Sequence, residues 1–450
     1  MKDVKLVRIL MISYAVYYLC PSDTQRLPKN VVVNLYTNLF EGFLHFIRPR
    51  MDRNVFQDPE SFMTTDKIIF HRGYPVEIHH VVTDDGYILA LHRIPSGRRE
   101  SYPQNVTSHL RRRPVFLQHG MMGSDHFWFI SSTNNSLAFI LADLGFDVWL
   151  GNSRGNTYSR KHVSLDPDED RGFWNFSWDE MGRFDITSSI DYILNVTREE
   201  TLAAYIGYSL GCSLFLISAI ERPEMNDKVD VMIGLGPTVS AAHLKNYFRL
   251  MAPFVKLYQL YQRIFGIGEV HTNDGVLHSI TRLICETSEF GAEFGRYWLS
   301  HVFGKSDVLN NDEYYRLIAH YPAGGSANTM THLLQNYNTG ESLSYFDYGA
   351  KENRKRYGTT LPPEYNLTLV TVPVMLVHSD NDPFAPLEDV SWLKTKLGNL
   401  KGSIRMDNPT FCHGDFVWSP HAAELVYLPV VRFLLSSEDL TGKHIARLQM

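Results

Sequence analysis

The 450-residue sequence has little cysteine, no long hydrophobic run and no excess of positive charge, and each shortage excludes a class of protein. Four cysteines are too few for a small scaffold held together by disulfides. No uncharged apolar stretch reaches the roughly 20 residues that a transmembrane helix needs. Asp and Glu (49) outnumber Lys and Arg (43), giving a net charge of -6, so we do not expect a nucleic-acid-binding protein.

The remaining composition is that of a large globular protein. Hydrophobic residues make up 44% of the chain and charged residues 20%, which excludes a disordered or collagen-like protein. A chain of 450 residues corresponds to two or three ordinary domains, or to one large α/β unit with an insertion.

The first residues are typical of a secretory signal peptide. Lys2, Lys5 and Arg8 precede an apolar stretch at residues 9–19, and we assign residues 1–22 to the signal. We therefore expect a secreted protein, or a lysosomal one that follows the same route. Five acceptor sequons agree with this and predict N-glycosylation at Asn105, Asn134, Asn175, Asn195 and Asn366.

Removal of the signal takes Cys20 with it and leaves Cys212, Cys285 and Cys412. An odd number of thiols cannot pair completely. None of them shows the CxxC spacing of structural zinc sites. We expect buried free thiols with at most one disulfide, and neither a metal nor an organic cofactor.

Residues 23–55 contain a predicted amphipathic helix that ends at Pro49. Its apolar side chains recur with helical spacing at Val32, Leu35, Tyr36, Leu39, Phe40, Phe43, Leu44 and Ile47. Such a helix either lies on a lipid surface or packs against the protein as a pro-segment. We favour packing, because the polar side of the helix is not rich in Lys or Arg.

A β-hairpin followed by a mostly parallel sheet is predicted from residue 56 onward. In the hairpin, Ile78, His80 and Val82 alternate toward one face before a turn at residues 84–86. Later short apolar runs alternate with helical stretches, which indicates right-handed crossovers and a sheet covered on both faces. These runs are residues 114–118, 146–150, 203–206, 229–235, 374–378 and 403–406.

The alternation stops between residues 240 and 366. This segment is rich in aromatic residues and methionine and has no clear strand pattern. We interpret it as an inserted, mainly helical domain, which divides the α/β core into residues 56–239 and residues 367–450.

The sequence GYSLG at residues 207–211 lies between a predicted strand and a helical run. A tight strand-to-helix turn lifts a serine hydroxyl above the sheet at a helix N-terminus, and only glycine fits on either side of it. The pattern GxSxG alone is common, but this placement is specific. Ser209 is therefore the candidate nucleophile.

An activated serine of this kind also needs an oxyanion hole. The strand at residues 114–118 is followed by the loop HGMMG at residues 119–123. We assign the two donors to the backbone amides of Met121, in that loop, and Leu210, which follows the serine.

The acid and the base are expected later in the chain, in the order Ser, Asp, His, on loops that follow strands. Asp382 and His413 occupy those places. Asp380 is the reserve acid and His421 the reserve base.

These motifs belong to a wider pattern that resembles the acid lipase family of gastric and lysosomal lipases over about residues 55–435. The two long matching segments are SLAFILADLGFDVWLGNSRGNTYSRKH at residues 136–162 and FWNFSWDEMGRFD at residues 173–185. Shorter ones are GYP at 73–75, TDDGYIL at 83–89, QHGMMG at 118–123, ERPEMND at 221–227, YPAGGS at 321–326, FDYG at 346–349, and residues 363–374.

The resemblance implies an α/β-hydrolase core with a lid-bearing cap inserted at residues 240–366, between the sixth strand and the strand that carries the acid. It also implies hydrolysis of the carboxylic esters of neutral lipids, triacylglycerol or cholesteryl ester, at a lipid–water interface. A non-catalytic lipid carrier and an acyltransferase are the alternatives on the same fold.

Residue by residue, Ser209, Asp382 and His413 match the catalytic triad of the family, and Met121 and Leu210 match its oxyanion positions. The family usually has GHSQG at the nucleophile, so Tyr208 and Leu210 depart from its pattern. A backbone amide can serve as the donor whatever side chain Leu210 carries. Cys285 is a lone cysteine where gastric members have a pair, which puts that disulfide in doubt.

We predict that the mature chain begins after Cys20, carries N-linked sugar and works without a metal. Intact-mass measurement before and after enzymatic deglycosylation checks the first two points, and assays with chelators check the third. An unprocessed Met1 with no mass change, or inhibition by chelators, would contradict the prediction.

Overall fold

The computed structural model describes residues 58–98, 112–270, 282, 285, 289–306, 309, 311–406 and 408–440. The predicted signal peptide, the amphipathic segment at 23–55 and Asn105 lie outside these residues.

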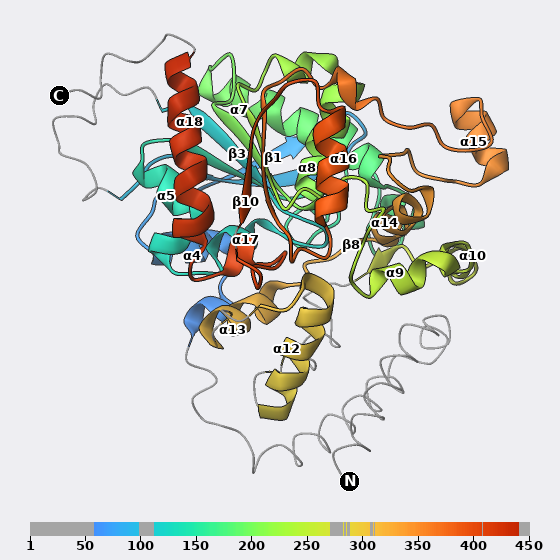
Figure 1. Ribbon diagram of the computed structural model, residues 1–450, viewed down its shortest axis with the longest axis horizontal. Helices are drawn as coiled ribbons and strands as arrows, with labels where there is room; N and C mark the ends of the chain where they lie inside the picture. The colour runs from blue at the N-terminus through green and yellow to red at the C-terminus, as the bar shows by residue number, and fades with distance from the viewer. Residues whose placement is uncertain are drawn as a thin grey trace.

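An eight-stranded sheet forms the centre of the molecule (Figure 1). Its strands, in spatial order, are β1 (Glu77–Val82), β2 (Ile88–Ile94), β4 (Asp147–Gly151), β3 (Pro114–Gln118), β5 (Ala204–Tyr208), β6 (Met232–Leu235), β9 (Val374–Ser379) and β10 (Leu400–Met406). The pairs β1–β2 and β2–β4 are antiparallel, and every other pair is parallel. The predicted mostly parallel α/β sheet is confirmed.

Helices cover both faces of this sheet. In Figure 1, α5 (Leu137–Asp143) and α18 (Leu428–Leu440) lie on one side, and α8 (Leu210–Glu221) and α16 (Leu387–Lys396) lie on the other. Helix α7 (Thr187–Thr197) is on the α8 side, since its Thr187 hydroxyl lies 2.9 Å from the Ser218 hydroxyl of α8. Shorter helices are α4 (Thr65–His71), α6 (Trp178–Glu180) and α17 (Asp415–Trp418).

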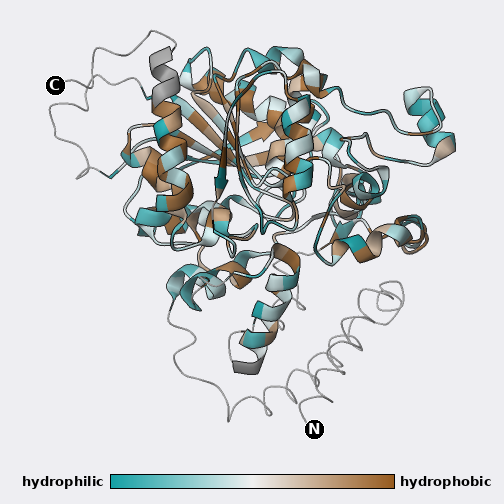
Figure 2. Ribbon diagram, viewed as in Figure 1, coloured by the Kyte–Doolittle hydropathy of each residue, from teal (hydrophilic) through white to brown (hydrophobic). Residues whose placement is uncertain are grey.

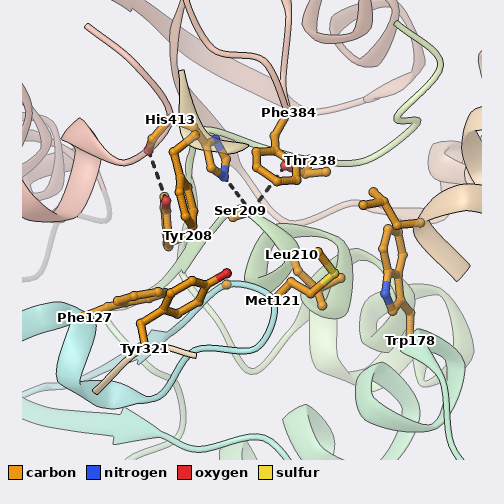
Figure 3. Close-up of a pocket in the computed structure, with 13 residues that line it drawn as sticks. Met121, Phe127, Trp178, Tyr208, Ser209, Leu210, Thr238, Tyr321, Phe384 and His413 are labelled. Atoms are coloured by element: carbon orange, nitrogen blue, oxygen red, sulfur yellow. Dashed lines mark hydrogen bonds between the residues drawn. The ribbon is translucent and has the colours of Figure 1, made fainter. Parts of the chain in front are cut away.

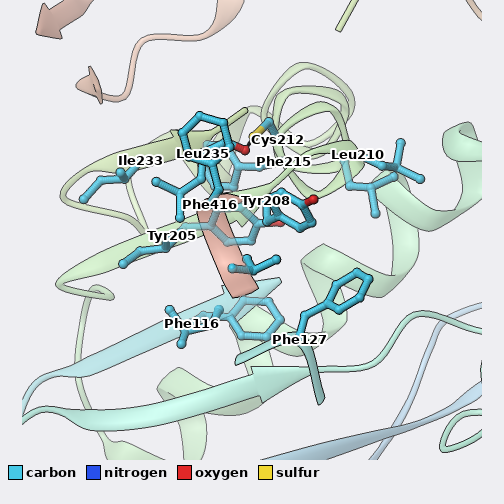
Figure 4. Packing of buried hydrophobic residues seen from close by; sticks show 14 of the residues in the cluster. Phe116, Phe127, Tyr205, Tyr208, Leu210, Cys212, Phe215, Ile233, Leu235 and Phe416 are labelled. Carbon is cyan, nitrogen blue, oxygen red and sulfur yellow. Dashed lines mark hydrogen bonds between the residues drawn. The ribbon is translucent and has the colours of Figure 1, made fainter. Parts of the chain in front are cut away.

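The core lies between the sheet and its helices, where the strands are apolar in Figure 2. Strands β3, β4, β5, β6 and β9 are buried along their whole length, as parallel strands covered on both faces are. Figure 4 shows the packing beneath α8, where the Tyr205 ring of β5 packs at a tilt against Phe215 at 4.6 Å and meets Phe116 of β3 edge-on at 5.5 Å. This packing fixes α8 over the centre of the sheet.

The predicted hairpin is present as β1 and β2, and only one of the two faces of β1 is covered. Ile78 and Val82 are 50% and 57% exposed, whereas Val81 is buried and His79 contacts Tyr192 of α7. Strand β1 is the edge of the sheet, and α7 covers only the face that carries His79 and Val81. Alternation along a strand identifies its two faces, but it does not say which face a helix covers.

Between β6 and β9 the described chain is mainly helical. Its elements are α9 (Phe248–Met251), α10 (Val255–Phe265), α12 (Glu289–Phe303), α13 (Asn311–His320), α14 (Ala327–Thr339) and α15 (Ala350–Tyr357), with a two-stranded pair of β7 (Glu269–Val270) and β8 (Gly325–Ser326). In Figure 1, α9, α10, α12 and α13 lie beyond the edge of the sheet toward which the β10 arrow points. They therefore face the carboxyl ends of the parallel strands.

Cys212, Cys285 and Cys412 are buried, and no disulfide joins them. No helix in the described part of the chain is long and apolar enough to cross a membrane.

We predict that Gly211→Ala destabilises the fold by about 1–3 kcal/mol, because overpacking at a rigid contact costs that much. A Cβ at Gly211 would lie 2.6 Å from the backbone oxygen of Gln118, which cannot move without shifting β3. Chemical denaturation measures the change. Gly172→Ala is the matched control, since a Cβ there meets nothing within 4 Å. Equal stability of the two variants would contradict the prediction.

Candidate active site

Ser209 occupies the tight turn between β5 and α8. Its φ of +56° and ψ of -119° are strained for a residue with a side chain, and such strain is stored at functional turns. A Cβ at Gly207 would lie 2.7 Å from the carbonyl carbon of Gly211, so the first glycine of the motif allows the strand and the helix to approach. The hydroxyl of Ser209 is thereby held at the N-terminus of α8.

The structure brings Asp382 and His413 to this hydroxyl (Figure 3). His413 Nε2 lies 2.8 Å from Ser209 Oγ, and His413 Nδ1 lies 2.7 Å from Asp382 Oδ2. A carboxylate only accepts hydrogen bonds, so Nδ1 carries the proton and Nε2 is left to accept one from the serine. All three residues are buried.

Asp382 is held by the backbone that follows it. Its Oδ1 accepts hydrogen bonds from the amides of Phe384 (2.8 Å) and Ala385 (2.9 Å), which leaves Oδ2 for His413. Gly236, at a φ of +53°, passes behind the pair, where a Cβ would lie 3.0 Å from Asp382 Oδ2. Sequence reasoning missed Gly236, because no motif marks a glycine whose role is to leave space for residues far along the chain.

His413 is positioned by residues from three other parts of the chain. Its amide donates to the carbonyl of Phe303 (3.0 Å), and its own carbonyl accepts from the hydroxyl of Tyr208 (3.1 Å). The ring of Phe384 lies 4.7 Å from the imidazole, and the ring of Tyr208 lies 5.1 Å from it. Tyr208, which departs from the family pattern, thus ties the histidine loop to the nucleophile elbow.

Neither reserve residue reaches Ser209. Asp380 forms an ion pair with Arg405 on the surface, with Nε 2.8 Å from Oδ1, and the hydrogen bond from Arg405 lowers the pKa of this carboxyl. His421 is exposed, and its backbone amide donates to Ser419 Oγ.

The loop at residues 119–123 is fixed by a buried histidine. Burial lowers the pKa of His119 to about 4, so its imidazole is neutral at neutral pH. Nδ1 donates to the Gly120 carbonyl (2.7 Å), and Nε2 accepts from the Ser153 amide (3.1 Å). The Met122 carbonyl also accepts from the amide of Ala323 (2.7 Å), so the segment between β6 and β9 braces this loop.

Arg154 anchors the loop after β4 that supports His119. It is fully buried and binds two carboxylates. Its Nε lies 2.6 Å from Asp185 Oδ1, and its Nη1 lies 2.6 Å from Asp85 Oδ2. Burial raises the pKa of Asp185 to about 6, although the neighbouring guanidinium opposes that shift. Arg154 and Asp185 lie in the two long segments that resemble acid lipases, so those segments have a structural role behind the site.

Met121 and Leu210 line one small pocket with Ser209 and His413. Figure 3 shows them next to each other near Trp178. The other walls are apolar rings, from Phe127, Trp178, Phe303, Tyr321 and Phe384. The space open to the centre of a water-sized sphere is only about 20 Å³, which is room for about one water molecule. The pocket is closed to an acyl chain in this conformation.

No cluster of three or more His, Cys, Asp or Glu residues suited to a metal ion occurs in the described ranges.

Comparison with known proteins identifies the same fold as the structure. A partial α/β-hydrolase lipase region matches residues 65–132, and the α/β hydrolase fold matches residues 113–420. The chain is 36% identical to gastric triacylglycerol lipase of Bos taurus over 387 residues, which cover 85% of this chain and 93% of that protein.

Two further relatives are similar over comparable lengths. Lipase 1 of Drosophila melanogaster is 36% identical over 388 residues, covering 85% of this chain and 81% of the relative. Lipase member N of Mus musculus is 34% identical over 386 residues, covering 84% and 92%. With the fold, the family matches and these identities in agreement, the chain belongs to the family of α/β-hydrolase lipases.

Proposed function

We propose that this protein is a serine lipase that hydrolyses the carboxylic esters of neutral lipids, triacylglycerol or cholesteryl ester, through an acyl-enzyme on Ser209. The observation that carries the proposal is the buried hydrogen-bonded chain from Ser209 through His413 to Asp382 at a strand-to-helix turn. The gastric triacylglycerol lipase of Bos taurus, at 36% identity, supports a glyceride ester as substrate.

The geometry indicates a role for each group. Ser209 Oγ attacks the ester carbonyl carbon while His413 Nε2 takes the hydroxyl proton, and Asp382 stabilises the imidazolium that forms. The carbonyl oxygen becomes an oxyanion, which the amides of Met121 and Leu210 stabilise, aided by the positive end of the α8 dipole. His413 then protonates the leaving alkoxide. A water molecule, deprotonated by the same histidine, releases the fatty acid.

We predict that Ser209→Ala reduces kcat on the order of a million-fold, because the nucleophile is lost. Hydrolysis of a soluble short-chain ester measures the loss, and circular dichroism checks that the variant folds. A serine-directed phosphonate is expected to label the wild type at Ser209 only. Retention of a tenth of the wild-type rate would reject the assignment.

The partners of the serine give a second prediction with built-in controls. We expect His413→Ala to reduce kcat nearly as much as loss of the serine, and Asp382→Asn to reduce it roughly 10⁴-fold. His421→Ala and Asp380→Asn remove the same side-chain types outside the pocket and should leave the rate close to wild type. If either control proved the more harmful, our assignment of base and acid would be wrong.

A serine triad alone does not select lipids, and we assign that role to the segment at residues 240–366 acting as a cap. Phe303 of α12 and Tyr321 after α13 close the pocket, which in this state has no room for an acyl chain. The pocket must therefore open, and a lipid surface can drive opening only by binding the open form better.

Helices α9 and α10 supply an exposed apolar face for that surface. Its members are Leu250, Met251, Phe254, Leu257, Leu260 and Ile264, each more than 40% exposed. Residues 240–268 contain no Asp or Glu, whereas Arg249, Lys256 and Arg263 flank the face. An apolar stripe beside basic side chains is typical of a helix that lies in a lipid–water interface.

We predict that Leu257→Ser with Ile264→Ser lowers the rate on an emulsified long-chain glyceride at least tenfold and leaves the rate on a soluble ester unchanged. The two side chains are 64% exposed, so their loss removes lipid contact and no internal packing. Leu361→Ser with Leu369→Ser is the control, because these leucines are exposed outside the α9–α10 face. Equal emulsion rates in both variants would contradict the cap as the lipid-binding surface.

Export through the secretory route fits the exposed sequons. Asn134, Asn175, Asn195 and Asn366 are all exposed, so each can be reached for N-glycosylation. We therefore infer a glycoprotein that is secreted or lysosomal.

An acyltransferase would use the same acyl-enzyme with an alcohol in place of water. The product distribution in the presence of a competing alcohol separates an acyltransferase from a hydrolase. The intact hydrogen-bonded triad favours an enzyme over a lipid carrier.

A further inference from the structure

A second cavity lies beside the catalytic pocket and is much the larger of the two. It runs between the start of α9, the last turn of α12 and the loop after β9 that carries Asp382. The space open to the centre of a water-sized sphere is about 350 Å³, against about 20 Å³ at Ser209. This falls within the size range of small-molecule sites. We call it the α9–α12 cleft.

The cleft presents uncompensated positive charge. Arg249 lines it and forms no ion pair with any residue that the structure describes. His301 also lines it, and its Nδ1 donates to the Tyr297 carbonyl (2.8 Å). Its Nε2 can donate to a carboxylate in the imidazolium form, in which both ring nitrogens carry a proton. The acid in the lining, Asp380, is already bound by Arg405. A carboxylate is therefore the complementary head group.

Tyr247, Leu250 and Pro383 form the apolar part of the wall. Its other members include the polar residues Asn246, Ser300 and Asn381, and Lys245, which pairs with Glu388. Tyr247 stacks on the His301 ring at 4.9 Å and is 45% exposed, and Leu250 is 58% exposed. Beyond them the apolar face of α9 and α10 continues without an acidic residue. A ligand that fits has an anionic head and a hydrocarbon tail.

We infer that the α9–α12 cleft binds the carboxylate of a fatty acid. The choice of ligand rests on the proposed function, since a fatty acid is the acid product of ester hydrolysis. The geometry also gives the binding a consequence. Phe303 covers the catalytic pocket and stacks on His413 at 6.2 Å, while Ser300 and His301 of the same helix face the cleft. A fatty acid that contacts α9 and α12 together holds the pocket closed.

Because binding in the cleft holds the pocket closed, we expect the fatty acid product to inhibit the enzyme. A ligand shifts an equilibrium only by its difference in affinity between the two states. The cleft needs α12 where it is, so a fatty acid in the cleft favours the closed state, which has no room for substrate, and raises the apparent KM. A fatty acid in the catalytic pocket would also raise the KM, but independently of Arg249 and His301.

The direct test is calorimetric titration of the full-length Ser209→Ala protein with monomeric decanoate, and with decanol as the uncharged probe. Arg249→Gln with His301→Gln is expected to weaken decanoate binding at least tenfold and to leave decanol binding within twofold. Lys256→Gln with Arg263→Gln removes basic side chains from α10, outside the cleft, and is expected to change decanoate affinity less than twofold. Thermal unfolding checks that both variants fold.

Equal loss in the cleft and control variants would mean general attraction to a basic surface and would overturn the proposal. No loss in either variant would place decanoate elsewhere and overturn it as well. In the wild-type protein, decanoate should raise the apparent KM for a soluble ester, and the cleft variant should need at least tenfold more decanoate for the same effect. Inhibition of equal strength in wild type and the cleft variant would reject the feedback. Wild-type activity without added decanoate tests the proposed function separately.

Discussion

The close approach of β5, α8 and the end of β3 is the constraint on which the site depends. Glycine at positions 207 and 211 lets backbone meet backbone at distances that exclude a Cβ. The turn this creates puts Ser209 in a strained conformation, with its hydroxyl above the sheet and the amide of Leu210 beside it. The aromatic packing under α8 holds the helix in place, so the strain does not relax.

The segment between β6 and β9 contributes to the site as well as covering it. The carbonyl of Phe303 holds the amide of His413, and the amide of Ala323 holds the carbonyl of Met122. His413 and the loop at residues 119–123 are thus both held by this segment, and Phe303 also lines the pocket over Ser209. Movement of α12 away from the pocket therefore has to break or shift a contact to the histidine loop. Opening of the pocket is thereby linked to the position of His413.

Buried ion pairs behind the pocket fix the positions of the loops that form it. Arg154 binds Asp85 and Asp185, and removing one partner of such a group would leave an uncompensated charge in the interior. Neutral His119 continues the support from this ionic group to the loop that carries Met121. Placement of the Met121 amide, the proposed oxyanion donor, thus depends on charges that lie outside the pocket.

The parallel sheet, the tight turn at Ser209 and the order Ser209, Asp382, His413 could all be predicted from the sequence, because glycine spacing and strand ends are local signals. The tertiary structure was needed to show which face of β1 is buried. It was also needed to show that Tyr208 contacts His413 and that Gly236 leaves space for Asp382. It alone placed His301 opposite Arg249 across a cleft. These pairings join residues far apart in the chain, and the pattern of one strand or helix carries no information about the element that packs against it.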